Sequence, residues 1–315
     1  MSIILRPINL KTDLPGLAAL RSEEAGEPVT VESLSEQEVK RPTDEITIRH
    51  VAVDSDGQIV GVGEAFHRAN HRPGAFWVMV HVALTCRRQG VGTALYNEVE
   101  AFARQQNASL LRIKLEENKT DGLRFANHLG FCIVQHEFRS MLDIAAFDAS
   151  RFADVIEAVQ AQGIRFFTFA ETDGGADAQR KLYDLNITTA GDNPSNDQSD
   201  VWPYEDFVRD VFGAGWFRPD GQIFAADGDA WIGMAAVGEV SPGKMHNMMT
   251  GVLREYRGRH IAFALKLLAI EFCRRRNAHS LETGNDSTNA PMLAINRKLG
   301  YRPEPGKYRL EKSLL

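Results

Sequence analysis

Hydrophobic residues gather along this chain in short runs that predict strands and helices in alternation. Residues 76–82 (FWVMVHV) are almost continuously apolar, as in a buried strand. After them Val91, Leu95, Val99 and Phe102 recur at helical spacing and predict an amphipathic helix that ends near residue 106. The pattern therefore predicts a strand that passes into a helix through the short loop RRQGVG at residues 87–92.

The remaining runs of the first half predict further elements of both kinds. Two apolar runs separated by Ser55-Asp56-Gly57 predict a β-hairpin. The patterns also predict strands at 2–8, 110–117 and 131–143, and helices at 13–24 and 120–129. This mixture places the chain in the α/β class.

The second half of the chain repeats this order at a constant offset of 170 residues. Val82 matches Val252, Arg87 matches Arg257, and Phe131 matches Tyr301, with no insertion between the first and last of these pairs. The repeat predicts a tandem of two similar domains, residues 1–145 and 146–315. In the second copy we expect a hairpin turning at Asp227-Gly228, a strand at 244–252 and a helix at 262–276. The polar stretch at 191–200 (GDNPSNDQSD) predicts a long exposed loop, and a flap on the substrate side is one interpretation of it.

Composition and charge narrow the class of function. The 315 residues carry a formal net charge of −6, which argues against general affinity for nucleic acid or an anionic membrane. No apolar run reaches the roughly 20 residues of a membrane helix, and the N-terminus lacks the features of a signal peptide. The three scattered cysteines (Cys86, Cys132, Cys273) show no metal-ligand spacing and indicate reduced thiols in a cytoplasmic protein.

The loop between the strand and the helix has the properties of an anion site. Glycine lets a backbone turn sharply and lets a ligand approach closely. The first turn of the following helix offers unpaired N–H groups and a partial positive charge. Together these features favour phosphate binding at residues 87–92, although an exposed turn with solvated arginines would give the same pattern.

These motifs resemble those of the GNAT acyl-coenzyme A transferases in their tandem-domain form. Arg87-x-x-Gly90-x-Gly92 fits the family signature Arg/Gln-x-x-Gly-x-Gly/Ala, and Arg257-x-x-His260-x-Ala262 departs from it at His260. Each copy also ends in Leu-Gly-Phe or Leu-Gly-Tyr after a short helix, as in the family. The resemblance implies two GNAT domains, each with a mixed, mostly antiparallel twisted sheet flanked by helices.

The resemblance also implies a site for acetyl-CoA. Family members bind its pyrophosphate with loop N–H groups, and its pantetheine arm lies in the split between the fourth and fifth strands. His260 in place of glycine could restrict the turn, contact a phosphate, or simply pack on the start of the helix. Carried over by motif, the cofactor-binding residues are Val82, Arg87, Arg88, Gln89, Gly90, Val91, Gly92 and Thr93 in the first copy, and Val252, Arg257, Gly258, Arg259, His260, Ile261, Ala262, Asn285 and Asn289 in the second.

A general base is expected on the strand before the loop, because an amine must be neutral to attack a thioester. In tandem relatives such a base can stand six residues before the valine that enters the loop. That count gives His246 in the second copy and Phe76, which cannot titrate, in the first. Strand alternation predicts that His246, Met248, Thr250 and Val252 share one face. The sequence therefore places catalysis in the second copy, unless His246 is an ordinary strand histidine, and leaves the first copy to bind CoA or act as a scaffold.

The general acid departs from the family pattern. Many members place a tyrosine four residues before the final glycine, where this chain has Ala126 and Asn296. Asn296 could donate a hydrogen bond to the cofactor instead, and we count it with His246 as a candidate catalytic residue. Asn289, just before Ala290-Pro291, could equally be the N-cap of the next helix.

These features predict a cytoplasmic N-acetyltransferase, monomeric or homodimeric, that moves an acetyl group from acetyl-CoA to a small-molecule amine. The missing tyrosines keep open a non-catalytic protein that binds CoA or senses acetyl-CoA. A third alternative is an acyltransferase with another acyl donor or acceptor. The sequence suggests neither a metal nor a nucleic-acid or membrane partner.

Overall fold

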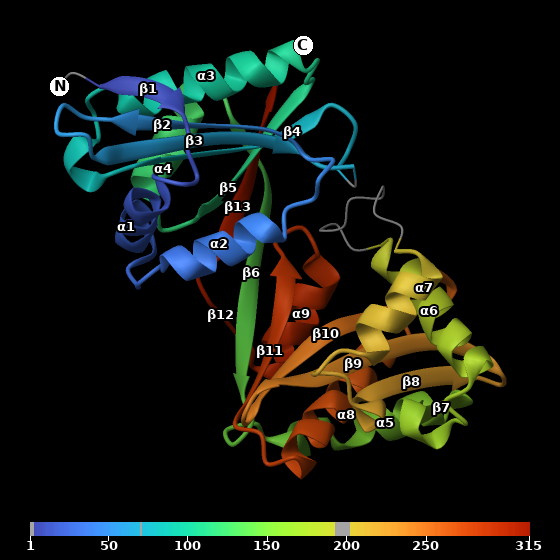
Figure 1. Ribbon diagram of the computed structural model, residues 1–315. Helices are drawn as coiled ribbons and strands as arrows, with labels where there is room; N and C mark the ends of the chain where they lie inside the picture. The colour runs from blue at the N-terminus through green and yellow to red at the C-terminus, as the bar shows by residue number, and fades with distance from the viewer. Residues whose placement is uncertain (1–2, 70, 193–201) are drawn as a thin grey trace. The chain divides into compact units, whose positions relative to one another are not determined.

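A computed structural model describes residues 3–69, 71–192 and 202–315 (Figure 1). The chain forms two compact units, and their boundaries differ from the single cut predicted after residue 145. Unit 1 contains residues 1–115 and 119–134 together with the chain end at 309–315. Unit 2 contains residues 116–118 and 135–308. The polar stretch predicted to be a flap lies largely outside the described residues, at 193–201.

Unit 1 contains a twisted sheet in the order β1-β2-β3-β4-β5-β13. All neighbours from β1 to β4 are antiparallel, whereas β4 and β5 are parallel. The last strand of the chain, β13, was not expected in this unit. The strands are β1 (Ile4–Pro7), β2 (Ile46–Val53), β3 (Ile59–His67), β4 (Ala75–Val82), β5 (Leu110–Glu116) and β13 (Lys307–Ser313).

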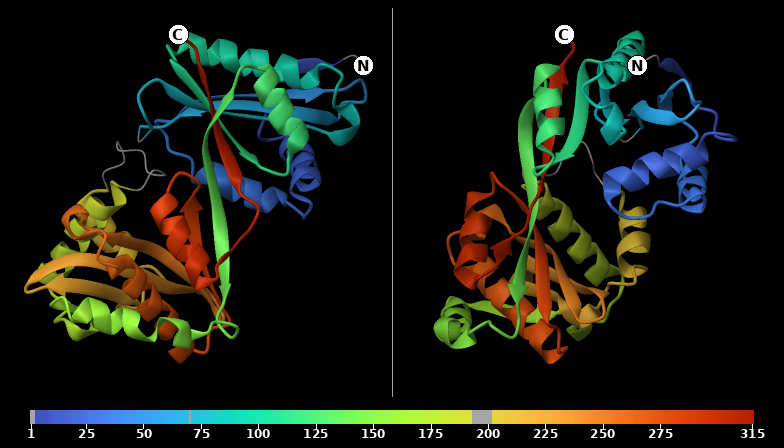
Figure 2. Two further views of the ribbon diagram at one scale, coloured as in Figure 1. Left: turned by 180° about the vertical axis from the view of Figure 1, so that it is seen from behind. Right: turned by 90° about the vertical axis from the view of Figure 1, so that its left-hand side faces the viewer.

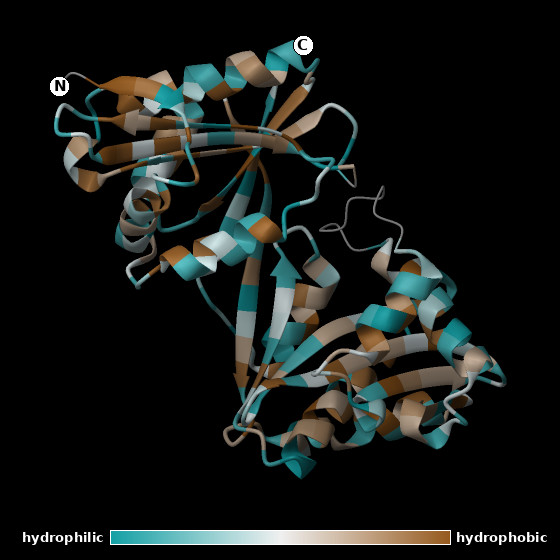
Figure 3. Ribbon diagram, viewed as in Figure 1, coloured by the Kyte–Doolittle hydropathy of each residue, from teal (hydrophilic) through white to brown (hydrophobic). Residues whose placement is uncertain are grey.

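Helices cover both faces of the unit 1 sheet, because apolar residues of β2 and β3 alternate between the faces (Figure 2). Val51 and Val62 pack against α1, whereas Ala52 and Val60 pack against α3. In Figure 3, β1, β2 and β3 carry much of the apolar colour of this unit. The helices are α1 (Leu14–Ala25), α2 (Val31–Val39), α3 (Val91–Gln105) and α4 (Thr120–His128), of which α2 was not predicted.

Unit 2 repeats this plan with the sheet order β6-β11-β10-β9-β8-β7, and β12 (Arg302–Pro303) pairs with β6. Again one neighbouring pair, β10 with β11, is parallel and the others are antiparallel. Each sheet is therefore mixed and mostly antiparallel, as predicted. The strands are β6 (Cys132–Asp143), β7 (Ile164–Thr168), β8 (Gln222–Asp227), β9 (Ala230–Ser241), β10 (Lys244–Val252) and β11 (Ser280–Asp286).

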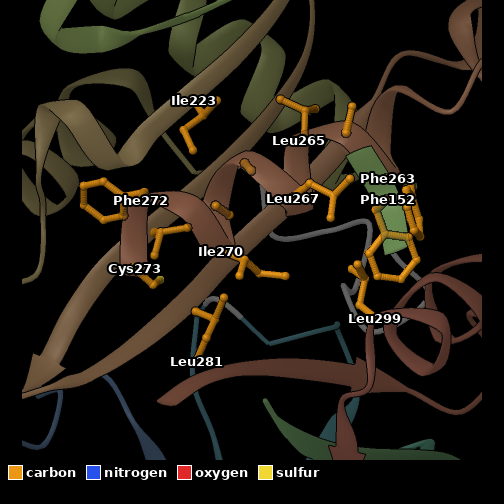
Figure 4. Packing of buried hydrophobic residues seen from close by; sticks show 14 of the residues in the cluster. Phe152, Ile223, Phe263, Leu265, Leu267, Ile270, Phe272, Cys273, Leu281 and Leu299 are labelled. Atoms are coloured by element: carbon orange, nitrogen blue, oxygen red, sulfur yellow. The ribbon is translucent and has the colours of Figure 1, made fainter. Parts of the chain in front are cut away.

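The main core of unit 2 lies between the sheet and helix α8. Leu265, Ile270 and Phe272 of α8 lie in one buried cluster with Ile223 of β8 and Leu281 of β11 (Figure 4). On the other face of the sheet, α6 and α7 cover a second apolar cluster. The helices are α5 (Ala153–Gln160), α6 (Ala176–Ala190), α7 (Tyr204–Phe207), α8 (Ile261–Arg275) and α9 (Ala290–Leu299).

A β-bulge in β10 distinguishes the two units. In β10, Asn247 pairs with Val237 and Met249 with Ala236, so Met248 has no partner on β9. The matching strand β4 pairs with β3 without interruption. Because a bulge adds one residue, side chains before it turn to the opposite face. The residue of unit 1 that occupies the place of His246 is therefore not the one that stands 170 positions earlier.

Candidate functional site

The two central strands of unit 2 separate where the bulge occurs. Strands β10 and β11 pair from Lys244 with Ser280 to Asn247 with Thr283, and no pairing follows. A cavity of about 1150 Å³ occupies the split and the space beside it. Residues 248–252 of β10, 283–286 of β11, and 256–258 and 260–263 at the start of α8 line this cavity.

The loop at the start of α8 keeps the glycine-type turn despite His260. His260 is the N-cap of α8 with φ 62°, and Gly90 is the N-cap of α3 with φ 84°. The second left-handed position of each loop is Gly258 with φ 78° in unit 2 and Arg88 with φ 61° in unit 1. Each loop therefore has one glycine and one larger residue in the left-handed conformation. The glycine comes second in unit 1 and first in unit 2, but the backbone follows the same path.

The signature arginine holds the strand to the loop in both units. Arg257 Nε donates to the Val252 carbonyl at 3.2 Å, and Arg87 Nε donates to the Val82 carbonyl at 3.0 Å. The guanidinium of Arg257 also contacts Asp192, and that of Arg87 contacts Glu24 at 3.0 Å. A guanidinium held in this way fixes the loop, so the N–H groups in the first turn of the helix are the groups left for an anion.

The other predicted loop residues take different places. Arg259 donates to Gln162, Gln89 donates to the Thr85 carbonyl, and Thr93 is exposed. Val91 and Ile261 are buried in the cores of their units. A Cβ on Gly92 would meet Phe125 and Val82 at 3.4 and 3.5 Å, so a larger residue there would crowd the helix start. Ala262 lines the cavity, and so do Val252, Arg257, Gly258, His260 and Ile261.

His246 lines the cavity and is held by a buried carboxylate. Its Nδ1 lies 2.7 Å from Oε1 of Glu282, which faces it across the parallel pair of β10 and β11. The Glu282 side chain is only 4% exposed and also contacts Lys244 at 2.8 Å and Arg139 at 3.4 Å. Burial alone would raise the pKa of Glu282, but the hydrogen bonds from His246 and Lys244 lower it below its usual value.

The prediction that His246, Met248, Thr250 and Val252 share one face of β10 is wrong, because the bulge interrupts the alternation of side chains. Val252 packs in the core beneath α8, and Thr250 Oγ1 donates to Asn247 Oδ1 at 2.9 Å on that same side. Met248 packs in the cluster on the α6 side. His246 and Met248 therefore lie apart from Thr250 and Val252. The same bulge makes Trp77, not Phe76, the counterpart of His246, since Trp77 pairs with Arg112 as His246 pairs with Glu282.

Three of the predicted asparagines form a buried polar cluster or a helix cap. Asn296 is 3% exposed, donates to Asn285 Oδ1 at 2.7 Å and does not line the cavity. Asn285 lines the cavity and donates to Ser140 Oγ at 3.0 Å. Asn289 caps α9 by accepting from the Met292 N–H at 3.3 Å, as one of the two interpretations predicted, and also lines the cavity.

Sequence reasoning missed a buried lysine at this site. Lys266 of α8 is 1% exposed, donates to Asn247 Oδ1 at 2.9 Å and lies 5.0 Å from the centre of the Tyr301 ring. Burial lowers its pKa to about 7. Its signal in the sequence was a single charge within the apolar run AFALKLLAI, and that of Glu282 was a charge directly after the apolar Leu281 in β11.

Asn247 connects this lysine to the bulge. Its Nδ2 donates to the carbonyls of Ala236 at 3.1 Å and Met249 at 2.7 Å, and its Oδ1 accepts from Thr250 and Lys266. These bonds span the extra residue of β10. Asn247 therefore stabilises the irregular backbone that opens the split.

A family model described as "Acetyltransferase (GNAT) family" matches residues 15–131 and 180–301. The chain belongs to the GNAT acetyltransferase family. Both matched regions contain the loop and the helix that follows it, so the family assignment applies to both units. GNAT proteins generally use acetyl-CoA, and the split strands with an adjoining helix start are consistent with that donor.

Solved structures of other GNAT proteins show the same fold over nearly the whole chain. One is a GCN5-related N-acetyltransferase from Sphaerobacter thermophilus, with 20% identity and a TM-score of 0.65, covering 99% of this chain and 95% of that chain. Another is a tandem GNAT protein from the clavulanic acid biosynthesis pathway, with 18% identity and a TM-score of 0.62, covering 99% and 98%. A third is the glucosamine N-acetyltransferase region of a fungal multi-domain GH3 beta-N-acetylglucosaminidase, with 14% identity and a TM-score of 0.68, covering 98% of this chain and 38% of that chain. No curated protein matches the sequence.

Among the described residues of this GNAT protein, no helix has both the length and the apolar character needed to cross a membrane. The three cysteines are free thiols, with Cys86 and Cys273 buried and Cys132 exposed.

Proposed function

We propose that this GNAT protein transfers an acetyl group from acetyl-CoA to the amine of a small molecule, in the cavity of unit 2. The observation that carries the proposal is the position of His246, which lines the cavity at the point where β10 and β11 separate. The thioester would lie in the split. The free thiols support a cytoplasmic location, and we propose that the protein acts as a monomer or a homodimer.

The two sides of the split carry different groups. Leu281 and Thr283 of β11 face α8. The N–H groups at the start of this helix lie on the same side of the sheet. Glu282 and Gly284 alternate with them and face the other side, where His246 lies. The donor would therefore approach from the α8 side, with residues 257–262 at its phosphates, and the amine from the His246 side.

His246 is proposed as the general base. Because Nδ1 is directed to Glu282, Nε2 remains as the nitrogen that can accept a proton from the amine. Acetyl-CoA supplies the acetyl group as a thioester, so a C–N bond forms while the C–S bond breaks and CoA leaves. The proton taken by His246 passes to solvent or to the departing sulfur, and the imidazole returns to its neutral form.

One observation favours a second candidate, a protein that binds acetyl-CoA without transferring its acetyl group. The family's acid position holds Asn296, which is buried against Asn285 and is absent from the cavity lining. A third candidate keeps the acyl transfer but uses another acyl donor, since the loop would contact only the CoA part.

Release of free CoA thiol, measured with a library of small amines, tests the proposal. For an N-acetyltransferase, at least one amine should increase CoA release and appear as its acetamide in mass spectrometry. Tight acetyl-CoA binding by calorimetry, with no amine-dependent release across the library, would favour the binding protein. Release with a longer acyl-CoA but not with acetyl-CoA would favour the third candidate.

A further inference from the structure

The carboxylate behind His246 is unusual for the interior of a sheet. Glu282 lies in the middle of β11, with a side chain 4% exposed, and it is not itself part of the cavity lining. A buried carboxylate requires compensation by hydrogen bonds or opposite charge. Here that compensation comes from His246 and Lys244 of β10 and from Arg139 of β6. On the β9 side, His246 faces Gly238, which brings no charge.

We propose that Glu282 is a positioning residue, which fixes the tautomer and the orientation of His246 so that Nε2 faces the amine. This inference rests on the proposed function for its catalytic consequence, but the Glu282–His246 pair can be tested without it. In a neutral imidazole only one nitrogen carries a proton, and a carboxylate acceptor at Nδ1 selects the form with the proton there. The lone pair then lies on Nε2.

The bulge and the register make this pair specific to unit 2. The equivalent cross-strand pair in unit 1 is Trp77 with Arg112, and Arg112 Nε donates to Glu311 at 2.9 Å. Unit 1 therefore has a partly buried ion pair at the same place in its sheet, with the indole of Trp77 where unit 2 has the imidazole of His246. This supplies a control, because Glu311→Gln removes the carboxylate that contacts Arg112 without touching His246.

The charge of Glu282 has a second effect on the imidazole. A carboxylate 2.7 Å from Nδ1 favours the imidazolium that forms when His246 accepts a proton. Lys244 and Arg139 oppose this effect, since both are cations that contact the same carboxylate. Removal of the Glu282 charge therefore leaves His246 beside two cations, and protonation of the imidazole becomes harder.

Two variants separate positioning from charge. Glu282→Gln keeps an oxygen that can accept from Nδ1 but removes the charge, whereas Glu282→Leu removes both. We expect Glu282→Leu to lower kcat by roughly tenfold or more, within the range of general-base assistance, with KM for acetyl-CoA unchanged. Glu282→Gln should retain more turnover and shift the acidic limb of the pH–rate profile to lower pH. Glu311→Gln should leave both properties as in the wild type.

Nitrogen-15 NMR of the histidine rings provides a readout that does not need turnover. His246, assigned by comparison with His246→Ala, should carry its proton on Nδ1 in the wild type and in Glu311→Gln. In Glu282→Leu, if thermal unfolding shows it folded, the two tautomers should mix. An unchanged tautomer in Glu282→Leu, or no fixed tautomer in the wild type, would refute the proposal. Should Glu282→Leu fail to fold, a wild-type His246 whose proton is not fixed on Nδ1 would still refute the proposal.

These outcomes keep the positioning role distinct from the proposed function. A fixed Nδ1–H tautomer that is lost in Glu282→Leu, without acetylation of any amine, would support the pair and contradict the N-acetyltransferase. Acetylation that depends on His246 but not on Glu282, with the tautomer unchanged, would support the enzyme and contradict the pair.

Discussion

Units 1 and 2 have the same loop and helix but differ by one residue in the strand that leads into them. From the loop onward, α3 and α8 and then β5 and β11 begin at positions 170 residues apart, at Val91 and Ile261 and at Leu110 and Ser280. Before the loop, the bulge in β10 adds one residue. A single extra residue exchanges the two faces of a strand, so the repeated scaffold presents different side chains at the split.

At equivalent positions, unit 2 has an imidazole in place of an indole, a buried lysine in place of a tyrosine, and a glycine in place of a lysine. His246 corresponds to Trp77, Lys266 to Tyr96 and Gly284 to Lys114. In unit 1 the Tyr96 hydroxyl accepts from Lys312 at 3.0 Å, so a lysine is present but paired with Glu100. The two units therefore share the backbone path of the loop, whereas the imidazole of His246 and the buried amine of Lys266 at these positions belong to unit 2.

The largest effect is expected from His246→Ala. If His246 is the general base, turnover should fall by about 10²- to 10⁴-fold, while acetyl-CoA affinity changes little. Initial rates and calorimetric titration measure the two quantities. The acidic limb of the pH–rate profile should also disappear, because no imidazole has to be neutral.

The unit 1 counterpart for this test is Trp77→Ala. Loss of packing at Trp77 should lower stability, but turnover per folded molecule should remain. Near-normal turnover in His246→Ala, with the acidic limb retained, would show that the base is water or another residue. His246 would then no longer be a reason to assign catalysis to unit 2.

A second expected difference concerns the pH dependence of stability through Lys266. Its pKa is about 7 in the folded protein against 10.5 as the reference value, so between these values the unfolded chain binds the extra proton. Stability should therefore rise with pH over this window, by up to about 1.4 kcal/mol per pH unit from this group. Lys266→Met should remove that slope, as measured by urea unfolding at several pH values between 7 and 10.

The control is Lys181→Met, since Lys181 is an exposed lysine of α6 in the same unit. It should leave the slope of stability against pH unchanged. Parallel slopes for the wild type and Lys266→Met would mean that Lys266 remains protonated in the folded protein. The polar contacts of Asn247 would then suffice to stabilise the buried cation.

A third test fills the space that Gly284 leaves beside His246. A Cβ on Gly284 would meet no atom within 4 Å, and its φ lies outside the left-handed region. Glycine is thus not required by the backbone, and a strand interior without a side chain often marks close approach of a ligand. Gly284→Leu should lower kcat/KM for the amine by about tenfold or more, with acetyl-CoA binding retained.

Gly215→Leu is the matched control, because a Cβ on this exposed glycine also meets nothing within 4 Å and Gly215 does not line the cavity. Its kinetics should equal those of the wild type. If Gly284→Leu also keeps the wild-type kcat/KM, the amine does not approach over β11, and the acceptor side of the split would have to be reassigned.

The sequence predicted those features that depend on local pattern. Helix spacing located α3 and α8, and apolar runs located β4 and β10, because burial imposes these periods directly. The bulge was not predictable in this way, since Asn247 stabilises it through bonds to Ala236 and Lys266 that are distant in the chain. The same holds for Asn296, whose buried bond to Asn285 depends on how α9 meets β11. The position of β13 in unit 1 likewise depends on its pairing with strands distant in the chain, and such pairing leaves no periodic pattern in the sequence.

The smallest effect is expected at the exchanged loop positions, through His260→Gly. His260 adopts φ 62°, a region that costs a non-glycine residue about 1 kcal/mol or more. Glycine removes that cost but loses more conformational freedom on folding, by roughly 0.5–1 kcal/mol. The free energy of unfolding should therefore change by less than about 1 kcal/mol. If the main chain makes the phosphate contacts, acetyl-CoA affinity should also stay the same, as measured by calorimetric titration.

Arg88→Gly provides the equivalent change in unit 1, where the left-handed residue is an arginine with φ 61°. A tenfold or greater loss of affinity in His260→Gly alone would mean that the imidazole itself contacts a phosphate. The two loops would then bind the donor by different means, and their common backbone path would not imply a common function.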